Sequence, residues 1–439
     1  MIAGAEIARD LGGHIPPGWD ALAAAAAPRL QRELTHTIVP FWQRTLDAER
    51  GGVFNCWNNE GTRLVRRDKF SWSQGRFAWL WARLGDAAGR GLIEGEAREF
   101  VAHADKTLRF LEAHTFLPDG RCAFLLSEAG EVLEALPGQG PAPSIYADCF
   151  VAMGLAEYAR VTGDAQRMER AWQLVDLIEA RVAAGDFPTH PSPIPAGYEA
   201  HGITMIRLNV MLVLHAASER LGEARAEQSW RRCVALTEKI FETFVQPDGR
   251  LVELRRLDRA PDDSLLARHI NPGHTLECVW MLFAVAARER RADWIARAGE
   301  VARVACERGW DETHGGLLHF TDGEGGEPRG AASGAIYERS VREAWANKLW
   351  WVHSEAIYAM LLAYRLTGDE RARAWFERVC EYALRVFPQP DRAVGEWIQI
   401  RDRTGAPVEK VVALPVKDPY HVARNLIQAL ELFAGGKGS

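Results

Sequence analysis

Asp248-Gly-Arg-Leu-Val-Glu253 is one copy of a short motif that recurs along this chain of 439 residues. In each copy a glycine-bearing turn stands next to residues that favour β-structure, a pattern typical of a hairpin or loop at a helix end. The copies return roughly every 65 to 80 residues, which leaves room for two helices in each interval. The others are Gly51-Gly-Val-Phe-Asn55, Asp119-Gly-Arg-Cys-Ala-Phe124, His314-Gly-Gly-Leu-Leu-His-Phe320, Gly395-Glu-Trp-Ile-Gln-Ile400 and a degenerate copy near Gly185-Asp-Phe-Pro188.

The segments between these motifs carry apolar residues at helical spacing and indicate an all-α protein. A second repeat supports this: Tyr158-Ala-Arg-Val-Thr-Gly-Asp164 and Tyr364-Arg-Leu-Thr-Gly-Asp369 both read as helix-end turns. Six intervals of two helices predict a closed α/α toroid of about twelve helices, with short β-hairpins at one end. We expect a single domain over residues 1–439, with residues 1–20 as an N-terminal extension. The alternative is an open α-solenoid that binds other proteins.

The amino-acid composition limits the kinds of binding partner that the protein can have. The net charge of −6 argues against nucleic acid, because such proteins usually concentrate basic residues on one face. The alanine run at 23–27 is too short to span a bilayer, and the start lacks a secretory pattern, so we expect a cytoplasmic protein without a membrane partner. The seven cysteines show no zinc-like spacing and are interpreted as reduced core residues. Sixteen tryptophans would suit a cavity whose aromatic faces stack on sugar rings, although core packing explains most tryptophans in any chain.

Asn271-Pro-Gly-His-Thr-Leu-Glu277 is the most informative segment for chemistry. Pro272 and Gly273 mark a loop that enters a helix, and the spacing of His274 and Glu277 places both on one face. A carboxylate beside an imidazole makes a tuned acid/base group. The alternative is that this histidine only caps the helix.

A second dense segment runs from Glu343 to Glu355. Helical spacing predicts that Glu343, Asn347 and Trp350 form one stripe, which would suit the wall of a polar cavity. His353 and Glu355 are expected to point elsewhere and to pair structurally.

Two further segments carry cationic groups. Pro419-Tyr-His-Val-Ala-Arg424 places His421 and Arg424 three residues apart at the start of the last apolar helix. Lys69-Phe-Ser-Trp-Ser-Gln-Gly-Arg76 places Arg76 near Trp72, where a guanidinium could hold a sugar oxyanion. A surface charge is the alternative for Arg76 taken alone.

Other chemistries lack their motifs. The chain has no dinucleotide fingerprint after a strand, no phosphate-binding loop with its lysine, no His-Glu-x-x-His and no Gly-x-Ser-x-Gly. We therefore expect neither a cofactor nor a metal.

Six of these motifs in sequence, from about residue 40 to 434, make the chain resemble the N-acylglucosamine 2-epimerase family, whose mammalian members are also called renin-binding protein. The motifs are Gly51-Gly-Val-Phe54, Gln74-Gly-Arg76, Asn271-Pro-Gly-His-Thr-Leu-Glu277, His314-Gly-Gly-Leu317, Lys348-Leu-Trp-Trp-Val-His-Ser-Glu355 and His421-Val-Ala-Arg424.

The resemblance implies an (α/α)6 barrel, commonly a homodimer, that interconverts N-acyl-D-glucosamine and N-acyl-D-mannosamine without a metal or redox cofactor. His274 and His421 would be the acid/base pair on opposite faces of C2, and Arg76 and Arg424 would stabilise the enediolate oxygen. The orienting groups would be Glu277 and Glu343. The expected substrate contacts are Trp72, Asn209, Asn347, Trp350 and Trp351.

The chemistry leaves rivals open. A base can remove the C2 proton of an opened aldose because the C1 carbonyl makes it acidic, and return of that proton to C1 would give an aldose-ketose isomerase instead. Leu212 stands where many isomerases and cellobiose 2-epimerases of this family carry a histidine, which favours the N-acyl epimerase, although a shifted alignment would bring in His215. Activation by ATP is known in the family, but Gly138-Gln-Gly-Pro141 offers no lysine for it. More distant alternatives are an α/α-barrel glycoside hydrolase, which needs paired acids, and a non-catalytic carbohydrate-binding toroid.

Overall fold

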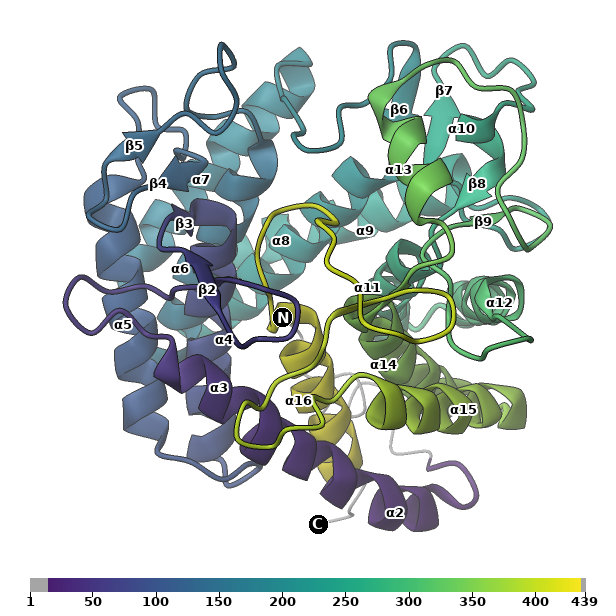
Figure 1. The fold of residues 1–439 in the computed structure, drawn as a ribbon, viewed down its shortest axis with the longest axis horizontal. Helices are drawn as coiled ribbons and strands as arrows, with labels where there is room; N and C mark the ends of the chain where they lie inside the picture. The colour runs from purple at the N-terminus through teal and green to yellow at the C-terminus, as the bar shows by residue number, and fades with distance from the viewer. Residues whose placement is uncertain (1–14, 436–439) are drawn as a thin grey trace.

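The computed structural model describes residues 15–435 and shows two concentric rings of helices (Figure 1). The inner ring consists of α4 (Ser71–Gly89), α6 (Ile145–Thr162), α8 (His201–Leu221), α11 (Pro272–Arg288), α14 (Trp350–Thr367) and α16 (Tyr420–Gly435). The outer ring consists of α5 (Ala97–His114), α7 (Ala165–Ala184), α9 (Arg225–Thr243), α12 (Ala292–Gly309), α15 (Glu370–Val386) and a continuous rod of α2 (Trp19–Arg32), η1 (Glu33–Ile38) and α3 (Val39–Arg44).

The ring is closed. Each inner helix packs on the next, and α16 packs on both α14 and α4. The outer partner of α16 is α2, so the first helices of the chain complete the last repeat. The predicted toroid of about twelve helices is therefore confirmed, and the open solenoid is excluded because a solenoid leaves its terminal repeats apart.

Five of the six predicted hairpins lie at one end of the barrel, where an outer helix returns to the next inner helix; near Gly185 no hairpin closes, because Thr189 bridges to Ser144 instead. Backbone bridges close them at Leu46 and Val53, Phe116 and Cys122, Val245 and Leu251, Trp310 and Leu317, and Pro388 and Trp397. Side chains of the inner helices accept hydrogen bonds from the backbone N–H of the residue after the turn. Gln74 Oε1 accepts from Val53 N at 2.8 Å, and His353 Nε2 accepts from Leu317 N at 2.9 Å. These hydrogen bonds fix the two hairpins to the inner ring.

Short antiparallel strand pairs join neighbouring repeats at this end. The strand before an inner helix pairs with the strand after the following hairpin, with registers such as Ala200 to Leu254 and Ile270 to Thr321. The strands are β1 (Cys56–Trp57), β2 (Leu64–Arg66), β3 (Lys69–Phe70), β4 (Leu125–Leu126), β5 (Val132–Leu133), β6 (Tyr198–Ala200), β7 (Leu254–Arg256), β8 (His269–Ile270), β9 (Thr321–Asp322), β10 (Lys348–Leu349) and β11 (Ile400–Arg401). Two short helices, α10 (Leu265–Arg268) and α13 (Ile336–Ala344), lie between them in the chain.

The other end of the barrel has tight turns. Gly163 and Gly368 end α6 and α14 with φ values of 84° and 66°, which is the left-handed region that glycine reaches without strain. Asp164 and Asp369 follow them and accept hydrogen bonds from the first amides of α7 and α15. The repeated Thr-Gly-Asp turns are thus helix stops followed by helix caps, as the sequence predicts.

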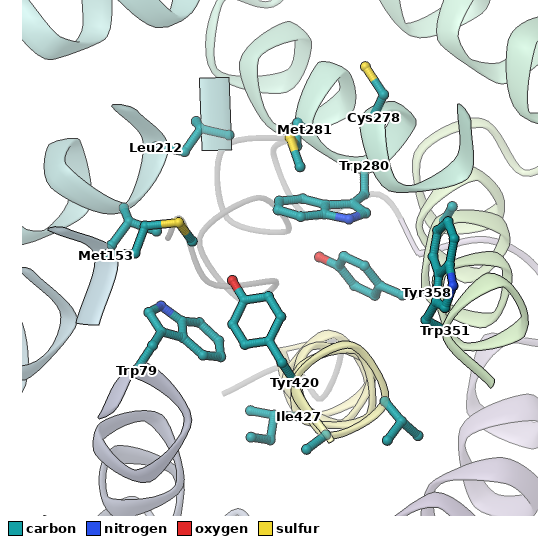
Figure 2. Close-up of a cluster of buried hydrophobic side chains, with 14 of the residues drawn as sticks. Trp79, Met153, Leu212, Cys278, Trp280, Met281, Trp351, Tyr358, Tyr420 and Ile427 are labelled. Atoms are coloured by element: carbon teal, nitrogen blue, oxygen red, sulfur yellow. The ribbon is translucent and has the colours of Figure 1, made fainter. Parts of the chain in front are cut away.

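The axis of the barrel is filled rather than hollow. Figure 2 shows large apolar and aromatic side chains that converge from all six inner helices below the hairpin end. They include Trp79 of α4, Met153 of α6, Leu212 of α8, Trp280 of α11 and Tyr358 of α14. Close packing at the axis depends on glycine: a Cβ on Gly75 would lie 2.5 Å from the backbone of Phe150, so α4 and α6 touch there.

The amino-terminal boundary differs from the prediction. Residues 1–14 of the predicted extension lie outside the described residues, but Trp19 already begins α2 and is 1% exposed. Its ring contacts Tyr364 and Phe433, so an extension that reaches residue 20 is wrong. Within residues 15–435, no helix combines the length and the apolar character needed to cross a bilayer.

Candidate active site

A cavity of about 260 Å³ opens among the hairpins, above the filled axis. This volume lies near the lower end of small-molecule pockets, roughly 300–1,000 Å³. Its wall takes side chains from the first turns of the inner helices and from the residues that follow the hairpins. The polar ones include Arg76, Asn209, Glu253, Asn271, His274, Glu277, His319, Asp418 and His421.

His274 lies in the first turn of α11. The side chain of Asn271 caps this helix by accepting from His274 N at 3.2 Å. The imidazole Nδ1 lies 2.8 Å from Glu253 Oε2, so Nε2 is the ring nitrogen left for a ligand. Burial acts to lower the pKa of His274, but the charge and hydrogen bond of Glu253 outweigh it and raise the pKa above the ordinary value. The resting imidazole is therefore biased toward its protonated, acidic form.

His421 lies in the first turn of α16 and has the opposite bias. Its Nδ1 is 2.7 Å from Glu355 Oε1, which again leaves Nε2 for a ligand. Burial lowers the pKa of His421 to about 3; Glu277 opposes this shift, and the charges of Arg76 and Arg424 reinforce it. The neutral imidazole is the form of a general base.

Trp351 of α14 touches both imidazoles. The ring centroids of His274 and Trp351 are 5.3 Å apart, and those of Trp351 and His421 are 5.4 Å apart. Gly273 permits this arrangement, because a Cβ at that position would lie 2.4 Å from the Trp351 ring. The two predicted histidines are thus brought into one cavity and share one aromatic neighbour.

Arg76 reaches the same cavity from α4. Its Nη1 donates to Asp418 Oδ2 at 2.7 Å, and its guanidinium lies 4.1 Å from the ring centroid of Phe150. The Nε of Arg76 is buried without a hydrogen-bond partner among the described residues. A cation held by one ion pair, with a donor still unused, can stabilise a developing oxyanion.

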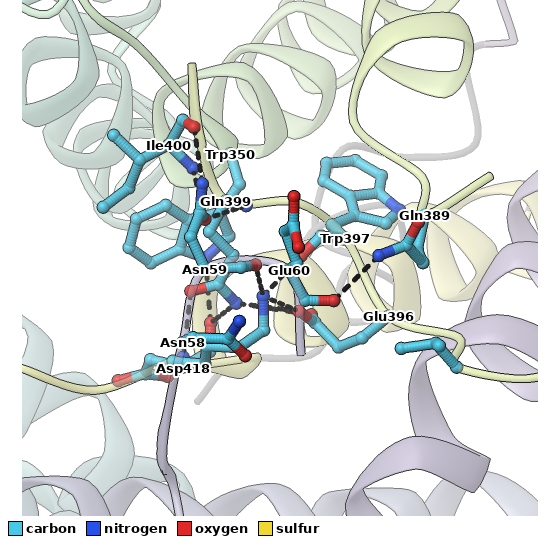
Figure 3. Close-up of polar contacts among 12 residues, drawn as sticks. Asn58, Asn59, Glu60, Trp350, Gln389, Glu396, Trp397, Gln399, Ile400 and Asp418 are labelled. Atoms are coloured by element: carbon cyan, nitrogen blue, oxygen red, sulfur yellow. Dashed lines mark hydrogen bonds and ion pairs between the residues drawn. The ribbon is translucent and has the colours of Figure 1, made fainter. Parts of the chain in front are cut away.

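A polar network fixes Asp418, and with it Arg76 (Figure 3). Gln399 Oε1 accepts from Asp418 N at 3.1 Å, and Asp418 O accepts from Trp350 Nε1 at 2.8 Å. Gln399 itself is held by Asn59, whose Oδ1 accepts from Gln399 N at 2.9 Å. Trp350 lines the cavity and also anchors this network.

Arg424 differs from the prediction. Its side chain is 0% exposed and lies behind the cavity wall rather than in it. Its Nη2 donates to Glu277 at 3.0 Å and also to Glu355. Glu277 therefore pairs with Arg424, and with His421 at 3.7 Å, rather than with His274. Arg424 acts as a positioning residue behind His421.

The predicted stripe of Glu343, Asn347 and Trp350 is wrong. The helix α13 ends at Ala344, and residues 348–349 form β10, so no single helix joins the three residues. Glu343 is exposed, and Asn347 is buried without lining the cavity. Glu355, expected to point elsewhere and to pair with His353, is the carboxylate that holds His421, whereas His353 bonds to the backbone of Leu317 and Leu349.

The remaining predicted contacts lie in the cavity wall. Trp72 and Asn209 both line it, and the buried Oδ1 of Asn209 has no partner among the described residues. Leu212 lies deeper, in the apolar axis (Figure 2). His215 does not line the cavity; its ring packs on Trp230 and its Nδ1 lies 2.9 Å from Ala226 O. The shifted alignment that would use His215 is therefore excluded.

Among the cavity residues that sequence reasoning missed, Glu253 and His319 occupy equivalent positions after their hairpins. Each is the second residue after the one that closes its hairpin, Leu251 or Leu317. Because successive side chains along an extended backbone point to opposite sides, a residue two positions after the closing residue points to the same side as that residue. Glu253 is the last residue of the motif that the sequence repeats, so its register in the hairpin is the signal that could have found it.

The pKa directions give a testable pH dependence. Glu253→Gln removes the main charge that raises the pKa of His274, so burial is opposed only by the charges of Glu277 and Glu355 and that pKa falls. We expect the alkaline limb of the kcat/KM profile to move to lower pH, because His274 loses its proton sooner. The pH profile of kcat/KM in wild type and variant measures this. An unchanged alkaline limb would show that His274 is not the group that titrates there.

A polar cavity at one end of an (α/α)6 barrel, with two imidazoles of opposite protonation bias and a nearby guanidinium, defines an acid/base enzyme site. The comparisons with known proteins agree with this class. The model of the family N-acylglucosamine 2-epimerase (GlcNAc 2-epimerase) matches residues 52–425, so the chain belongs to this family.

Relatives and solved structures extend the comparison. The chain is 31% identical to the N-acylglucosamine 2-epimerase of Bos taurus over 92% of its own length and 90% of that protein. It is also 31% identical to the enzyme of that name from Homo sapiens, over 92% and 89%. The solved structure of cellobiose 2-epimerase from Bacillus thermoamylovorans B4167 shares the fold, with a TM-score of 0.72 and 19% identity over 92% of this chain and 98% of that one.

Proposed function

We propose that this protein epimerises N-acyl-D-glucosamine and N-acyl-D-mannosamine at C2 of the ring-opened sugar. The observation that carries the proposal is the pair of imidazoles in one cavity, each held through Nδ1 by a carboxylate and biased toward opposite protonation states. Membership of the family and the 31% identical relatives support the choice of an N-acyl sugar.

The reaction follows from this geometry. The Nε2 of neutral His421 takes the C2 proton, and the electron pair of that C–H bond forms C1=C2 while the π pair of C1=O moves onto O1, which becomes an enolate oxygen. Arg76 stabilises the negative charge on O1. Protonated His274 then gives the proton on its Nε2 to C2 from the other face, which inverts that carbon. The reverse direction exchanges the two roles.

The carboxylates of the site favour proton transfer over hydrolysis. A glycoside hydrolase needs one carboxyl group as acid and another as base or nucleophile. Here Glu253 is engaged by His274, and Glu277 and Glu355 by Arg424. Each of the three carboxylates is therefore already paired with a histidine or an arginine, and none is left as an unpaired acid for hydrolysis.

Isotope exchange tests the proposal. The protein is incubated in heavy water with N-acetyl-D-mannosamine, D-mannose or cellobiose, and deuterium is located by NMR. Deuterium at C2 of both N-acetyl epimers supports the proposal. Deuterium at C1 of a ketose product would establish an aldose-ketose isomerase, and reaction of cellobiose alone would establish a cellobiose 2-epimerase.

We expect activity without a dissociable metal. Glu277, Glu355 and His421 bring ligand atoms within 4.8 Å of one another, which is the spacing of a metal site. However, the guanidinium of Arg424 already donates to both carboxylates and supplies the positive charge there. Extensive dialysis against EDTA should therefore leave kcat unchanged. Loss of activity that a divalent ion restores would contradict this prediction.

The family also guides three expectations about the protein in the cell. We propose that the protein is cytoplasmic and forms a homodimer. We also propose that its only ligand is the small sugar substrate, without nucleic acid or membrane. No redox cofactor is required by the proton transfers above. Control by ATP stays a separate question, which an assay with and without ATP answers.

A further inference from the structure

One part of the cavity wall, here called the apolar wall, is made by two loops. The first lies between α7 and β6 and contributes Pro191, Pro193, Ile194 and Pro195. The second lies between β11 and α16, passes over the centre of the barrel in Figure 1, and contributes Val412, Ala413, Leu414 and Val416. Residues 190–196 and 411–416 contain no lysine, arginine, aspartate or glutamate.

The reacting groups come from other elements. Arg76 belongs to α4, His274 to α11 and His421 to α16. The cavity therefore joins the charged groups of the chemistry to a wall without charged side chains, whose only hydroxyl-bearing lining residues in the two loops are Thr189 and Ser192. A sugar hydroxyl placed against that wall would lose its hydrogen bonds to water without replacement, at a cost in free energy. The wall is built for an apolar part of the ligand.

We propose that the apolar wall binds the acyl chain of the N-acyl sugar and accepts chains longer than acetyl. This inference rests on the proposed function, which places C2 between the two imidazoles with the C1 oxygen near Arg76. The two other substituents of C2 are the hydroxyl-bearing C3–C6 chain and the acylamino group. Only the acyl group can contact the apolar wall without losing hydrogen bonds.

The loops are prepared for this contact. Ile194 and Val412 are half-buried while they line the cavity, so each retains apolar surface for a ligand to cover. Three prolines in the first loop restrict its backbone, which lowers the entropy lost on binding. Val411 is adjacent in sequence, but it is 64% exposed and does not line the cavity.

A chain-length series tests the proposal. The kcat/KM for epimerisation is measured with the N-acetyl, N-propanoyl and N-butanoyl derivatives of D-mannosamine. Each buried methylene contributes about 0.8 kcal/mol, a factor of about four. We expect kcat/KM to rise two- to fourfold with each added methylene in the wild-type protein.

Matched variants locate the effect. Val412→Thr replaces a methyl group of the wall by a hydroxyl at nearly the same shape, and Ile194→Thr does so and also shortens the side chain. Each should reduce the ratio of kcat/KM for the N-butanoyl substrate to kcat/KM for the N-acetyl substrate. Val411→Thr makes the same chemical change outside the cavity and should leave the series as in wild type.

The outcomes separate the two proposals. If the N-acetyl sugar is epimerised and kcat/KM is flat or falls with chain length, the acyl-chain proposal is overturned and the proposed function stands. A rise that Val411→Thr reduces as much as Val412→Thr also overturns it. If no N-acyl sugar is epimerised, the proposed function fails, and the acyl-chain proposal fails with it.

Discussion

His421→Asn and His274→Asn should each lower epimerase turnover in both directions by roughly 10²- to 10⁴-fold, the range that a general acid or base contributes. Both directions are lost because inversion needs a proton removed from one face of C2 and another delivered to the opposite face. Progress curves from each epimer, followed by NMR, measure the loss.

The two variants should nevertheless differ in isotope exchange. His274→Asn keeps His421, whose pKa is lowered to about 3 and which is neutral at pH 7. It should still exchange the C2 proton of one epimer with heavy water at neutral pH. His421→Asn keeps His274, whose pKa is raised, so its exchange of the other epimer should increase only as the pH rises and the imidazole becomes neutral.

Thermal unfolding provides the control for both histidine variants. Each imidazole lines a polar cavity, so its replacement should leave the unfolding transition close to that of wild type. If both variants are unfolded, the histidines are structural. If both epimerise at the wild-type rate, the chemistry lies at other residues.

Arg424→Met should destabilise the protein by about 3 kcal/mol, because it leaves two buried carboxylates without their cation. Glu277 and Glu355 both accept from the Arg424 guanidinium, which is 0% exposed. Burial raises the pKa of Glu355, and Arg424 opposes that shift. Without Arg424 the carboxyl takes up a proton, and it then holds the His421 Nδ1–H less strongly.

Urea denaturation and an activity assay check this prediction together. Arg371→Met is the matched control, since Arg371 pairs with Asp369 at the protein surface and its loss should leave stability unchanged. An Arg424→Met protein as stable as the control would show that the buried charges are compensated by other groups.

The fold could be predicted because its signals are local. A hairpin motif such as Asp248-Gly-Arg-Leu-Val-Glu253 and a turn such as Thr367-Gly-Asp369 act through backbone geometry that each short segment carries by itself. Their spacing gives the number of helix pairs, and ring closure follows once six pairs have to bury their apolar faces. The N-acylglucosamine 2-epimerase resemblance is confirmed for the same reason, because its motifs occur in order along nearly the whole chain.

The site was predicted only where a residue stands in such a motif. His274 and His421 lie in the first turn of an inner helix, Arg76 lies near the start of another, and each stands beside a glycine or proline signal. The structure brings all three into one cavity. Glu343 and Arg424 do not line the cavity, because the position of a residue in a motif does not determine how deeply its side chain is buried. A break after Ala344 leaves Glu343 exposed, and the surrounding inner helices enclose Arg424 completely.

The amino-acid sequence by itself determined the repeat, the helix ends and the kinds of group available for proton transfer, since these depend on neighbours within a few residues. The tertiary structure alone decided which carboxylate serves which imidazole. Glu253 reaches His274 from a hairpin 21 residues earlier, and Glu355 reaches His421 from a helix 66 residues away. Closure of the ring sets these two pairings, and the pairings together with burial set the opposite protonation of the two imidazoles. No local sequence pattern encodes either.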